Sequence, residues 1–371
     1  MSPKEVEPSR PAVVGFTLCS NLQRDFQQVS VITATYNNER YIKSCIESIL
    51  CQSIKDFEFI IVDDGSTDKT FEILREYEKK DKRVVIIRNK ENKGAANSRN
   101  AAFHKSKGKF IAIIDSDDVA LPTRLEKQVR FLNSHTEYGI VGSMIAYIDE
   151  NGKHITLKEA LPKGGEIIGD MLEDPCQIFN SSCMFRREVF EELGGYREEF
   201  KKAEDWDLFL RLQERGLTSR GSTSKGYKLY NLPEILHYQR TSFTRGMVLY
   251  RREQFIYGEI AKRLAYQRRN KGKDLLEEGN YEAFNKLKEE ISGRWMPRWV
   301  ELSANYFKWS HHMYHRGPKK LAQDFIKKSV ATNPFNLSAW VFLFFLYSNK
   351  RVQTIMLKLK RTLIKKPVVK N

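Results

Sequence analysis

Four short apolar runs, separated by segments with helical periodicity, make up the first third of the chain. The runs are hydrophobic on both faces, which predicts buried strands at Val29–Thr35, Phe57–Val62, Val84–Ile87 and Phe110–Ile114. The segments between them predict helices at Tyr41–Cys51, Lys69–Lys80 and Ala95–Ser106. This alternation indicates an α/β fold with a doubly wound, mostly parallel sheet flanked by helices.

The pattern becomes less regular over residues 139–240. A strand predicted at Ile140–Ile148 ends at Asp149-Glu-Asn-Gly152, a sequence typical of a hairpin turn. We also expect an apolar run, a short helix ending at two glycines, an amphipathic helix and a last strand, at Ile178–Phe185, Gly194-Gly195, Trp206–Arg215 and Ile235–Arg240. From Thr244 onward the pattern is helical and basic.

Positive charge is concentrated in the C-terminal third. The whole chain has a formal net charge of +16. Residues 1–240 contain 36 Lys and Arg against 37 Asp and Glu, whereas residues 241–371 contain 27 against 10. This asymmetry favours contact between the C-terminal third and an anionic surface, and it argues against nucleic-acid binding by the whole chain.

The last residues, 349–371, contain eight Lys and Arg and no acid. An apolar residue recurs every three or four positions, as on one face of a helix, at Val352, Met356, Leu359 and Leu363. A helix of this kind binds an anionic membrane surface, with on the order of 1 kcal/mol from each basic residue. A solvated terminus, or one packed on the core, explains the same pattern, but the preceding aromatic run Trp340–Tyr347 favours the membrane.

The cysteines and the length of the longest apolar stretch indicate where in the cell the protein is expected. Five cysteines form no C-x-x-C pair, which predicts buried, reduced thiols, and they are Cys19, Cys45, Cys51, Cys176 and Cys183. The first thirty residues lack the pattern of a secretory signal. The longest apolar stretch, Ala339–Tyr347, has nine residues, whereas a membrane-spanning helix needs about 20. We expect a cytoplasmic protein with peripheral contact at the inner face of the cell membrane.

Two predicted strands end in closely spaced acids. Asp63 and Asp64 follow the second strand, and Asp115-Ser-Asp117-Asp118 follows the fourth. In an open parallel sheet the carboxyl ends of the strands meet at one edge, where ligands bind. Adjacent carboxylates repel each other unless a cation or hydrogen-bond donors offset the charge. The sequence therefore predicts a metal or diphosphate site at this edge.

The D-x-D spacing of Asp115 and Asp117 suits a divalent cation. Alternate residues of an extended segment point to one side, so both carboxylates can face one ion. Hard oxygen ligands suit Mg²⁺ or Mn²⁺ held jointly with phosphates. Asp118 has an alternative role as a cap of the helix expected to start near Pro122-Thr123.

Three further segments carry candidate chemistry. Asp63–Asp68 has the features of a strand-to-helix loop, yet its paired acids can also accept a hydrogen bond from uracil N3–H. The small-residue turn Asn92-Lys-Gly94, followed by Arg99, suits an anion. The acids of Glu204–Asp207 complement the dipole of the helix they open, or one of them acts as a general base on a hydroxyl.

These motifs occur in order, and over residues 29–240 they resemble a family 2 glycosyltransferase of the GT-A fold. The segments that carry the resemblance are Val31-Ile-Thr-Ala-Thr-Tyr-Asn37, Val62-Asp-Asp-Gly-Ser-Thr-Asp68, Asn92-Lys-Gly94 with Ser98-Arg-Asn100, Asp115-Ser-Asp117-Asp118 with Pro122 and Arg124-Leu125, and Glu204-Asp205-Trp-Asp-Leu208. The resemblance implies an inverting transfer of sugar from a nucleotide-sugar to a hydroxyl of a glycan or lipid-linked acceptor, in cell-surface polysaccharide synthesis. It favours a UDP-sugar donor and Mn²⁺ or Mg²⁺ as cofactor.

The resemblance also implies roles for single residues. Those that would bind the donor are Thr33, Ala34, Tyr36, Asp63, Asp64, Arg99 and Asp115. Asp117 would hold the metal. His237 is a second candidate ligand, although its order with Arg240 departs from the family pattern and a structural histidine fits equally. Asp205 would be the catalytic base, with Glu204 beside it toward the acceptor.

On this interpretation the chain has four parts. They are an N-terminal extension (1–28), a nucleotide-sugar-binding half (29–134), an acceptor-binding half (135–243) and a basic helical C-terminal region (244–371). A nucleotidyltransferase is an alternative, but it would need a Gly-rich basic triphosphate loop, which Thr33–Glu39 is not. A nucleic-acid-binding protein would use the basic third and leave the acidic motifs unexplained, so we expect no nucleic-acid partner.

Overall fold

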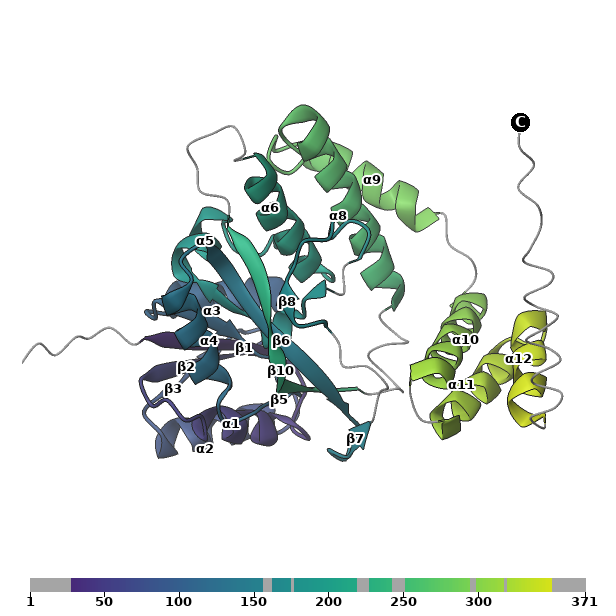
Figure 1. Ribbon diagram of the computed structural model, residues 1–371, viewed down its shortest axis with the longest axis horizontal. Helices are drawn as coiled ribbons and strands as arrows, with labels where there is room; N and C mark the ends of the chain where they lie inside the picture. Colours follow the sequence, from purple (N-terminus) through teal and green to yellow (C-terminus); the bar gives the residue numbers. More distant parts are fainter. Residues whose placement is uncertain are drawn as a thin grey trace, which may run out of the picture.

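The computed structural model describes residues 28–155, 162–174, 177–218, 227–241, 251–293, 298–316 and 319–348. At its centre lies a ten-stranded sheet with the order β3-β2-β1-β4-β9-β6-β10-β5, in which β7 also pairs with β6 and β8 with β10 (Figure 1). The predicted doubly wound sheet with flanking helices is confirmed.

The long strands pair in parallel. They are β1 (Val29–Thr35), β2 (Phe57–Asp63), β3 (Val84–Arg88), β4 (Phe110–Ile113), β6 (Tyr138–Ile148) and β10 (Lys228–Arg240). The short strands are β5 (Val119–Ala120), β7 (His154–Ile155), β8 (Gly165–Glu166) and β9 (Met184–Arg186), and each pairs antiparallel with its neighbours. The first four predicted strands are therefore confirmed to within a residue, because a run that is apolar on both faces is an unambiguous signal.

Alternate side chains of the central strands enter two hydrophobic cores, one on each face of the sheet. Val31 of β1 joins the core under α1 (Ile42–Leu50), α2 (Thr70–Lys80) and α4 (Arg124–Ser134). Ile32 joins the opposite core under α3 (Ala95–Lys105), α5 (Arg187–Glu192) and α6 (Glu204–Thr218). This period of two follows from strand geometry and leaves the polar strand ends at the edge between the layers.

Three elements differ from the sequence-based prediction. The apolar run Ile178–Phe185 is divided between a 3-10 turn η2 (Asn180–Ser182) and strand β9. The last strand begins at Lys228 rather than Ile235, because charged residues and Pro233 obscure the periodic pattern of a strand whose register beside β6 shifts three times. Helix α6 begins at Glu204, so the acids expected to precede the helix form its first turn.

The C-terminal region is helical, as expected, and its described helices belong to two separate hydrophobic cores. Helices α8 (Arg251–Lys271) and α9 (Tyr281–Gly293) contribute Leu264 and Phe284 to the core that also holds α6. Helices α10 (Arg298–Arg316), α11 (Lys319–Thr332) and α12 (Leu337–Tyr347) have a core of their own and lie away from the sheet (Figure 1). Residues 349–371, with their basic amphipathic pattern, lie outside the described residues.

The cysteines and the helix lengths of the described residues bear on two expectations from the sequence. Cys45 and Cys183 are buried free thiols as predicted, Cys51 is exposed, and Cys19 and Cys176 lie outside the described ranges. Among the helices of the described ranges, none combines the length and the apolar character that crossing a bilayer requires.

Candidate active site

The carboxyl ends of β1, β2 and β4 meet at one edge of the sheet. Thr35 of β1 pairs with Asp63 of β2, and the Asp64 backbone N–H donates to the Thr35 carbonyl oxygen at 2.8 Å. On the other side of β1, Ile32 pairs with Ile113, so the acids after β4 begin level with the last residues of β1. The two predicted acidic motifs are thus brought to the same edge by parallel register.

Asp64 holds the turn that leads into α3. Its Oδ1 accepts hydrogen bonds from Asn89 Nδ2 at 2.7 Å and the Lys93 backbone N–H at 2.9 Å, and its Oδ2 accepts from Gly94 N–H at 2.8 Å. A carboxylate has about four acceptor positions, so one remains. Gly94 has φ +92°, a conformation that glycine adopts without strain, which fits this close approach of the turn.

The other residues expected at the donor pocket differ in how accessible they are. Asp63 is buried, and its Oδ1 accepts from Ser66 N–H at 3.2 Å, while Oδ2 lies 3.2 Å from Arg88 Nε. Thr33 is also fully buried, and its hydroxyl has no hydrogen-bond partner. Ala34 is half-buried and Tyr36 is exposed, so these two present surface to a ligand at the end of β1.

Arg99 joins the acids after β4 to the acids of α6. Its Nη2 donates to Asp115 Oδ1 at 2.7 Å and its Nη1 to Glu204 Oε1 at 2.5 Å. Its guanidinium also lies 5.6 Å from the centre of the Tyr196 ring. Burial alone would lower the pKa of Arg99, but the charges of Asp115 and Glu204 outweigh burial and raise the pKa. The arginine is at the expected edge, but it neutralises carboxylates there and is not free for a phosphate.

Asp117 is a carboxylate without a partner side chain. Its backbone carbonyl accepts from Arg240 Nε at 2.8 Å, whereas no other described residue hydrogen-bonds to its carboxylate oxygens. Burial, and then the charges of Asp118 and Asp115, raise the pKa of Asp117 well above its usual range. The repulsion expected from the sequence is therefore present and is offset mainly at Asp115, by Arg99.

Asp118 does not cap a helix, which corrects the alternative proposed from the sequence. Helix α4 begins only at Arg124, and its N-cap Thr123 makes no side-chain capping bond. Asp118 instead accepts from Ser181 Oγ at 2.6 Å and from the Arg240 backbone N–H at 2.8 Å. Burial and the charge of Asp115 raise the pKa of Asp118, and these two bonds offset part of that effect. The Asp118 side chain therefore holds the acidic turn against η2 and the end of β10.

Both ring nitrogens of His237 are occupied by protein groups. The ring is buried, with Nε2 2.9 Å from Asp118 Oδ2 and Nδ1 3.3 Å from Arg124 Nη1. A guanidinium only donates, so Nδ1 accepts and Nε2 carries the proton. Burial, and then the charge of Arg124, lower the pKa of His237 well below its usual value, which keeps the ring neutral. This arrangement favours the structural histidine over the metal ligand.

The three acids in the first turn of α6 have different surroundings. Glu204 is paired with Arg99, and Asp207 is buried with Arg211 Nε at 2.8 Å. Among the described residues Asp205 has no basic partner, and its carboxylate accepts only from Trp206 N–H at 2.8 Å. Burial and the neighbouring charge of Glu204 raise the pKa of Asp205 to about 7, although Arg99 opposes the shift. A carboxylate with this pKa exchanges protons near neutral pH.

Comparison with known proteins assigns a family to this arrangement. The sequence pattern of glycosyl transferase family 2 matches residues 30–194. The glycosyltransferase EpsE of Bacillus subtilis is 36% identical over 229 residues, which cover 58% of this chain and 77% of that protein. The chain belongs to glycosyl transferase family 2.

Two further relatives carry glycosyltransferase names, and only one of these names specifies a reaction. A glycosyltransferase of Methanocaldococcus jannaschii, of uncharacterized function, is 40% identical over 194 residues, 51% of this chain and 66% of that protein. An Escherichia coli protein, 32% identical over 194 residues, covers 52% of this chain with 73% of its own length. It is named UDP-Glc:α-D-GlcNAc-diphosphoundecaprenol β-1,3-glucosyltransferase WfaP.

Solved structures confirm the GT-A fold. TarS of S. aureus in complex with UDP-GlcNAc has a TM-score of 0.51 and 17% sequence identity, and the match covers 88% of this chain and 92% of that one. The mannosyltransferase PcManGT of Pyrobaculum calidifontis, in complex with GDP-Man and Mn²⁺, has a TM-score of 0.50 and 17% identity, covering 89% and 84%.

The donor set at the family 2 site fits a divalent cation that is bound together with a phosphate. Asp117 offers a carboxylate without a partner, and Asp115, next to it on the same turn, offers the oxygen that Arg99 does not bind. In the described ranges no group of three or more His, Cys, Asp or Glu is arranged to hold a metal alone. Mg²⁺ and ions like it are commonly held by one or two carboxylates and completed by substrate phosphates.

Two residues at the site were not expected from the sequence. Ser181 receives the Asp115 backbone N–H at 2.9 Å and donates to Asp118, and Tyr196 lies under Arg99. Both come from the segment between β8 and α6, more than sixty positions after the residues that they contact. No local pattern marks such residues, because only the antiparallel insertion of β9 beside β4 brings them to this edge.

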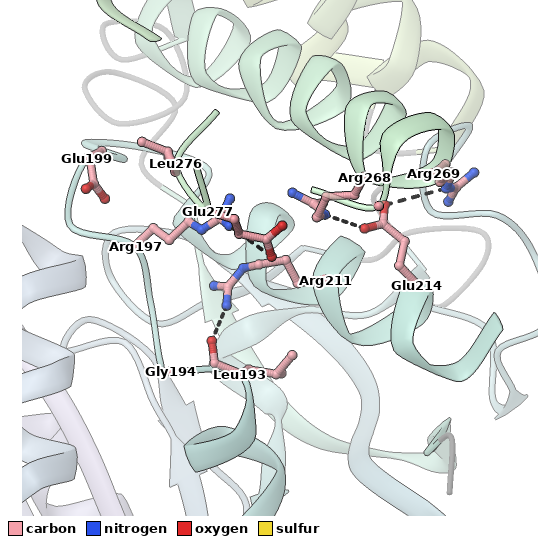
Figure 2. A pocket seen from close by; sticks show the side chains of 11 residues that line it. Leu193, Gly194, Arg197, Glu199, Arg211, Glu214, Arg268, Arg269, Leu276 and Glu277 are labelled. Atoms are coloured by element: carbon pink, nitrogen blue, oxygen red, sulfur yellow. Dashed lines mark hydrogen bonds and ion pairs between the residues drawn. The ribbon is translucent and has the colours of Figure 1, made fainter. Parts of the chain in front are cut away.

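A cavity of about 750 Å³ lies beside the later turns of α6, between that helix, the end of α8 and the turn before α9. Figure 2 shows arginines and acids in contact along its wall, with Glu214 between Arg268 and Arg269. None of the predicted site residues lines it. Its four arginines all have acidic partners, so the cavity wall is a balanced ion-pair network that joins α6 to α8.

Proposed function

We propose that this family 2 enzyme transfers a sugar, with inversion, from a UDP-sugar to a hydroxyl of a glycan or lipid-linked acceptor. The E. coli relative supports this, since its name specifies a UDP-sugar donor and a diphosphoundecaprenol-linked acceptor. We place the reaction in cell-surface polysaccharide synthesis at the inner face of the membrane. In this proposal residues 29–134 bind the donor and residues 135–243 the acceptor.

The main support for this proposal is the raised pKa of Asp205 and its lack of a basic partner among the described residues. Of the three acids at the start of α6, Asp205 alone lacks a basic partner within the described part of the chain, and its pKa of about 7 suits a general base at neutral pH. Arg99 restrains Glu204, and Arg211 restrains Asp207. The sequence left open which acid removes the proton, and these contacts favour Asp205, with Glu204 as its neighbour toward the acceptor.

The transfer step needs no covalent intermediate. Asp205 takes the proton of the acceptor hydroxyl while the hydroxyl oxygen forms a bond to the anomeric carbon. The bond from that carbon to the diphosphate oxygen breaks on the opposite face, and the nucleoside diphosphate leaves with the electron pair. The configuration of the anomeric carbon is therefore inverted.

Donor binding is assigned to the edge formed by β1, β2 and β4. Asp117, with the free oxygen of Asp115, would hold Mn²⁺ or Mg²⁺, which when bound stabilises negative charge on the leaving diphosphate. Ala34 and Tyr36 present accessible surface for the base and ribose, and Asp64 keeps one acceptor position for uracil N3–H. Thr33, Asp63 and Arg99 support this pocket from buried positions.

A screen of nucleotide-sugars with two variants tests the assignment. We expect Asp117→Asn to lose metal-dependent donor binding, measured by calorimetry with and without Mn²⁺. We expect Asp205→Asn to bind the donor normally and to lose about 10²–10⁴ in transfer rate, the usual contribution of a general base.

The matched control is Glu198→Gln, which changes an exposed acid near α6 and should leave both readouts unchanged. Equal donor hydrolysis and transfer by all four proteins would contradict the proposal. Release of diphosphate from a nucleoside triphosphate would instead identify a nucleotidyltransferase.

A further inference from the structure

Helix α12 is apolar on all sides, but only one side is buried. Ala339, Phe345 and Leu346 pack in the small core with α10 and α11. Six large side chains, 46% to 88% exposed, form what we call the α12 face: Phe335, Leu337, Trp340, Val341, Phe344 and Tyr347. Within the described residues no element covers this face. Contiguous apolar surface of this kind marks a contact site for a protein or a membrane.

The spacing of the α12 face makes it one continuous stripe. Leu337, Trp340, Phe344 and Tyr347 recur every three or four positions, and Phe335 extends the stripe into the preceding turn. Eleven helical residues span only about 16 Å, roughly half of a bilayer core. A helix of this length and polarity suits a position in the plane of a membrane surface and is too short to cross it.

The polar atom of the tryptophan in the stripe is already satisfied. Trp340 Nε1 donates to the Pro334 carbonyl oxygen at 2.8 Å. Tyr347 lies at the end of the stripe beside Lys327, whose Nζ is 5.3 Å from the ring centre. Amphipathic rings at the border between apolar and charged side chains are typical of proteins that bind at the lipid headgroup level.

Charge distinguishes between the possible partners. Residues 298–371 contain 15 Lys and Arg and two acids. Exposed lysines of α10 and α11 lie in the same small helical body as the stripe, at Lys308, Lys319, Lys320, Lys327 and Lys328. A second copy of this chain would bring like charges together, which opposes dimerisation through this face. An anionic lipid surface is complementary to both the charge and the apolar stripe.

We propose that the α12 face docks the protein on an anionic lipid bilayer. The apolar side chains enter the boundary between headgroups and acyl chains, and the lysines contact the lipid phosphates. This interaction requires neither donor nor acceptor, so it stands apart from the transfer reaction. The basic sequence 349–371, which follows α12 directly, adds positive charge at the same end of the chain.

Sedimentation with lipid vesicles tests the proposal on the full chain. The vesicles contain phosphatidylcholine alone or a mixture with phosphatidylglycerol, and no donor or acceptor is added. We expect binding to the mixed vesicles only. A triple variant, Phe335→Ser with Trp340→Ser and Phe344→Ser, should bind at least about tenfold more weakly, because burial of these side chains supplies the apolar free energy.

The three replaced side chains are exposed, so the variant should keep the fold, which circular dichroism will check. The matched control is Ile168→Ser, which removes a side chain as exposed as Phe335 from a distant surface and should bind like the wild type. Undiminished binding by the triple variant would overturn the proposal, as would equal binding to both kinds of vesicle. So would a dimer, detected by light scattering, that only the triple variant disrupts.

Discussion

At the scale of single residues, the first turn of α6 shows how neighbours give different roles to identical chemical groups. Asp205 and Asp207 are both aspartates of one helix and lie two positions apart. A buried arginine neutralises Asp207, whereas Asp205 has none, and the pKa of Asp205 is raised to about 7 by burial and Glu204. The arginines around Asp207, which include Arg197 as well as Arg211, therefore distinguish a structural carboxylate from the one that we propose as the base.

The raised pKa of Asp205 predicts the pH dependence of transfer. A general base acts when ionised, so the transfer rate at saturating substrates should rise as pH increases through about 7 and level off above it. Initial rates between pH 5 and 9 measure this directly. A rate that is already constant from pH 5 upward would show that Asp205 ionises at the usual aspartate value, near 4, and would remove the argument for it as the tuned base.

Asp118 offers a second prediction at this scale. In Asp118→Asn one carboxylate oxygen becomes an amide N–H₂, which then faces either the Arg240 backbone N–H or the donors of Ser181 and His237. The free energy of unfolding should therefore fall by about 1–3 kcal/mol. Because the turn with Asp115 and Asp117 is then held less firmly, more Mn²⁺ should be needed for half-maximal activity.

Thermal unfolding and a Mn²⁺ titration of activity measure these two effects of Asp118→Asn. Asp149→Asn is the control, since its carboxylate binds only backbone N–H groups of an exposed hairpin. If Asp118→Asn loses stability while its Mn²⁺ requirement equals that of the wild type, the carboxylate supports the fold and does not position the metal-binding turn.

At the scale of elements, α6 is held to α8 by buried ion pairs along the cavity of Figure 2. Arg268 contacts both Glu214 and Asp274, and Arg197 contacts both Asp274 and Asp207. The helix that carries Asp205 is therefore positioned in part by residues that lie outside the proposed active site. Removing one partner of a buried pair leaves an uncompensated charge, so the network is sensitive to single changes.

Arg268→Met tests this connection between α6 and α8. The change leaves Glu214 without its nearest arginine and removes one of two arginines from Asp274, so the free energy of unfolding should fall by about 3–5 kcal/mol. The control is Lys286→Met, which breaks an exposed pair with Glu282 on α9 and should change stability by less than about 1 kcal/mol. Denaturant titrations of both variants give the comparison, and equal losses would show that the network adds nothing beyond a surface ion pair.

The same scale shows what the sequence could and could not predict. Strands β1 to β4 and the acids at their ends were predictable, because both depend on a local pattern and on parallel register. Strand β5 has two residues and β10 is interrupted by Pro233, so neither gives a full periodic signal. The partners of the acids were not predictable, since Ser181 and Tyr196 are brought to Asp115 and Arg99 by tertiary structure alone.

At the scale of the whole molecule, the C-terminal region is divided between two hydrophobic cores. Helices α8 and α9 supply Ile260, Leu264 and Phe284 to the core of the sheet, so the catalytic body is incomplete without them. Helices α10 to α12 share a separate core around Phe325 and Ile326. The boundary suggested by the hydrophobic packing therefore lies near residue 293, fifty positions after the change in sequence pattern at Thr244.

Two truncations test this boundary. A chain ending at Gly293 keeps the whole first core, so it should unfold cooperatively and bind donor like the full protein. A chain ending at Thr241 exposes the apolar side chains of α6 that α8 covers, and it should aggregate or fail to unfold cooperatively. Calorimetric unfolding and donor titration measure both. Cooperative unfolding of the shorter chain would show that α8 and α9 are dispensable for the fold.

The position of Arg99 between two carboxylates connects the binding of the two substrates. One guanidinium is shared between Asp115, which we propose lies near the donor, and Glu204, which we propose lies toward the acceptor. In the proposed mechanism, a cation bound to the other oxygen of Asp115 competes with Arg99 for the charge of that carboxylate, so donor binding alters the charge that the acceptor meets at Glu204. Thermodynamic linkage makes such an effect reciprocal. We therefore expect donor binding to change the affinity for the acceptor, and acceptor binding to change the affinity for the donor, through Arg99.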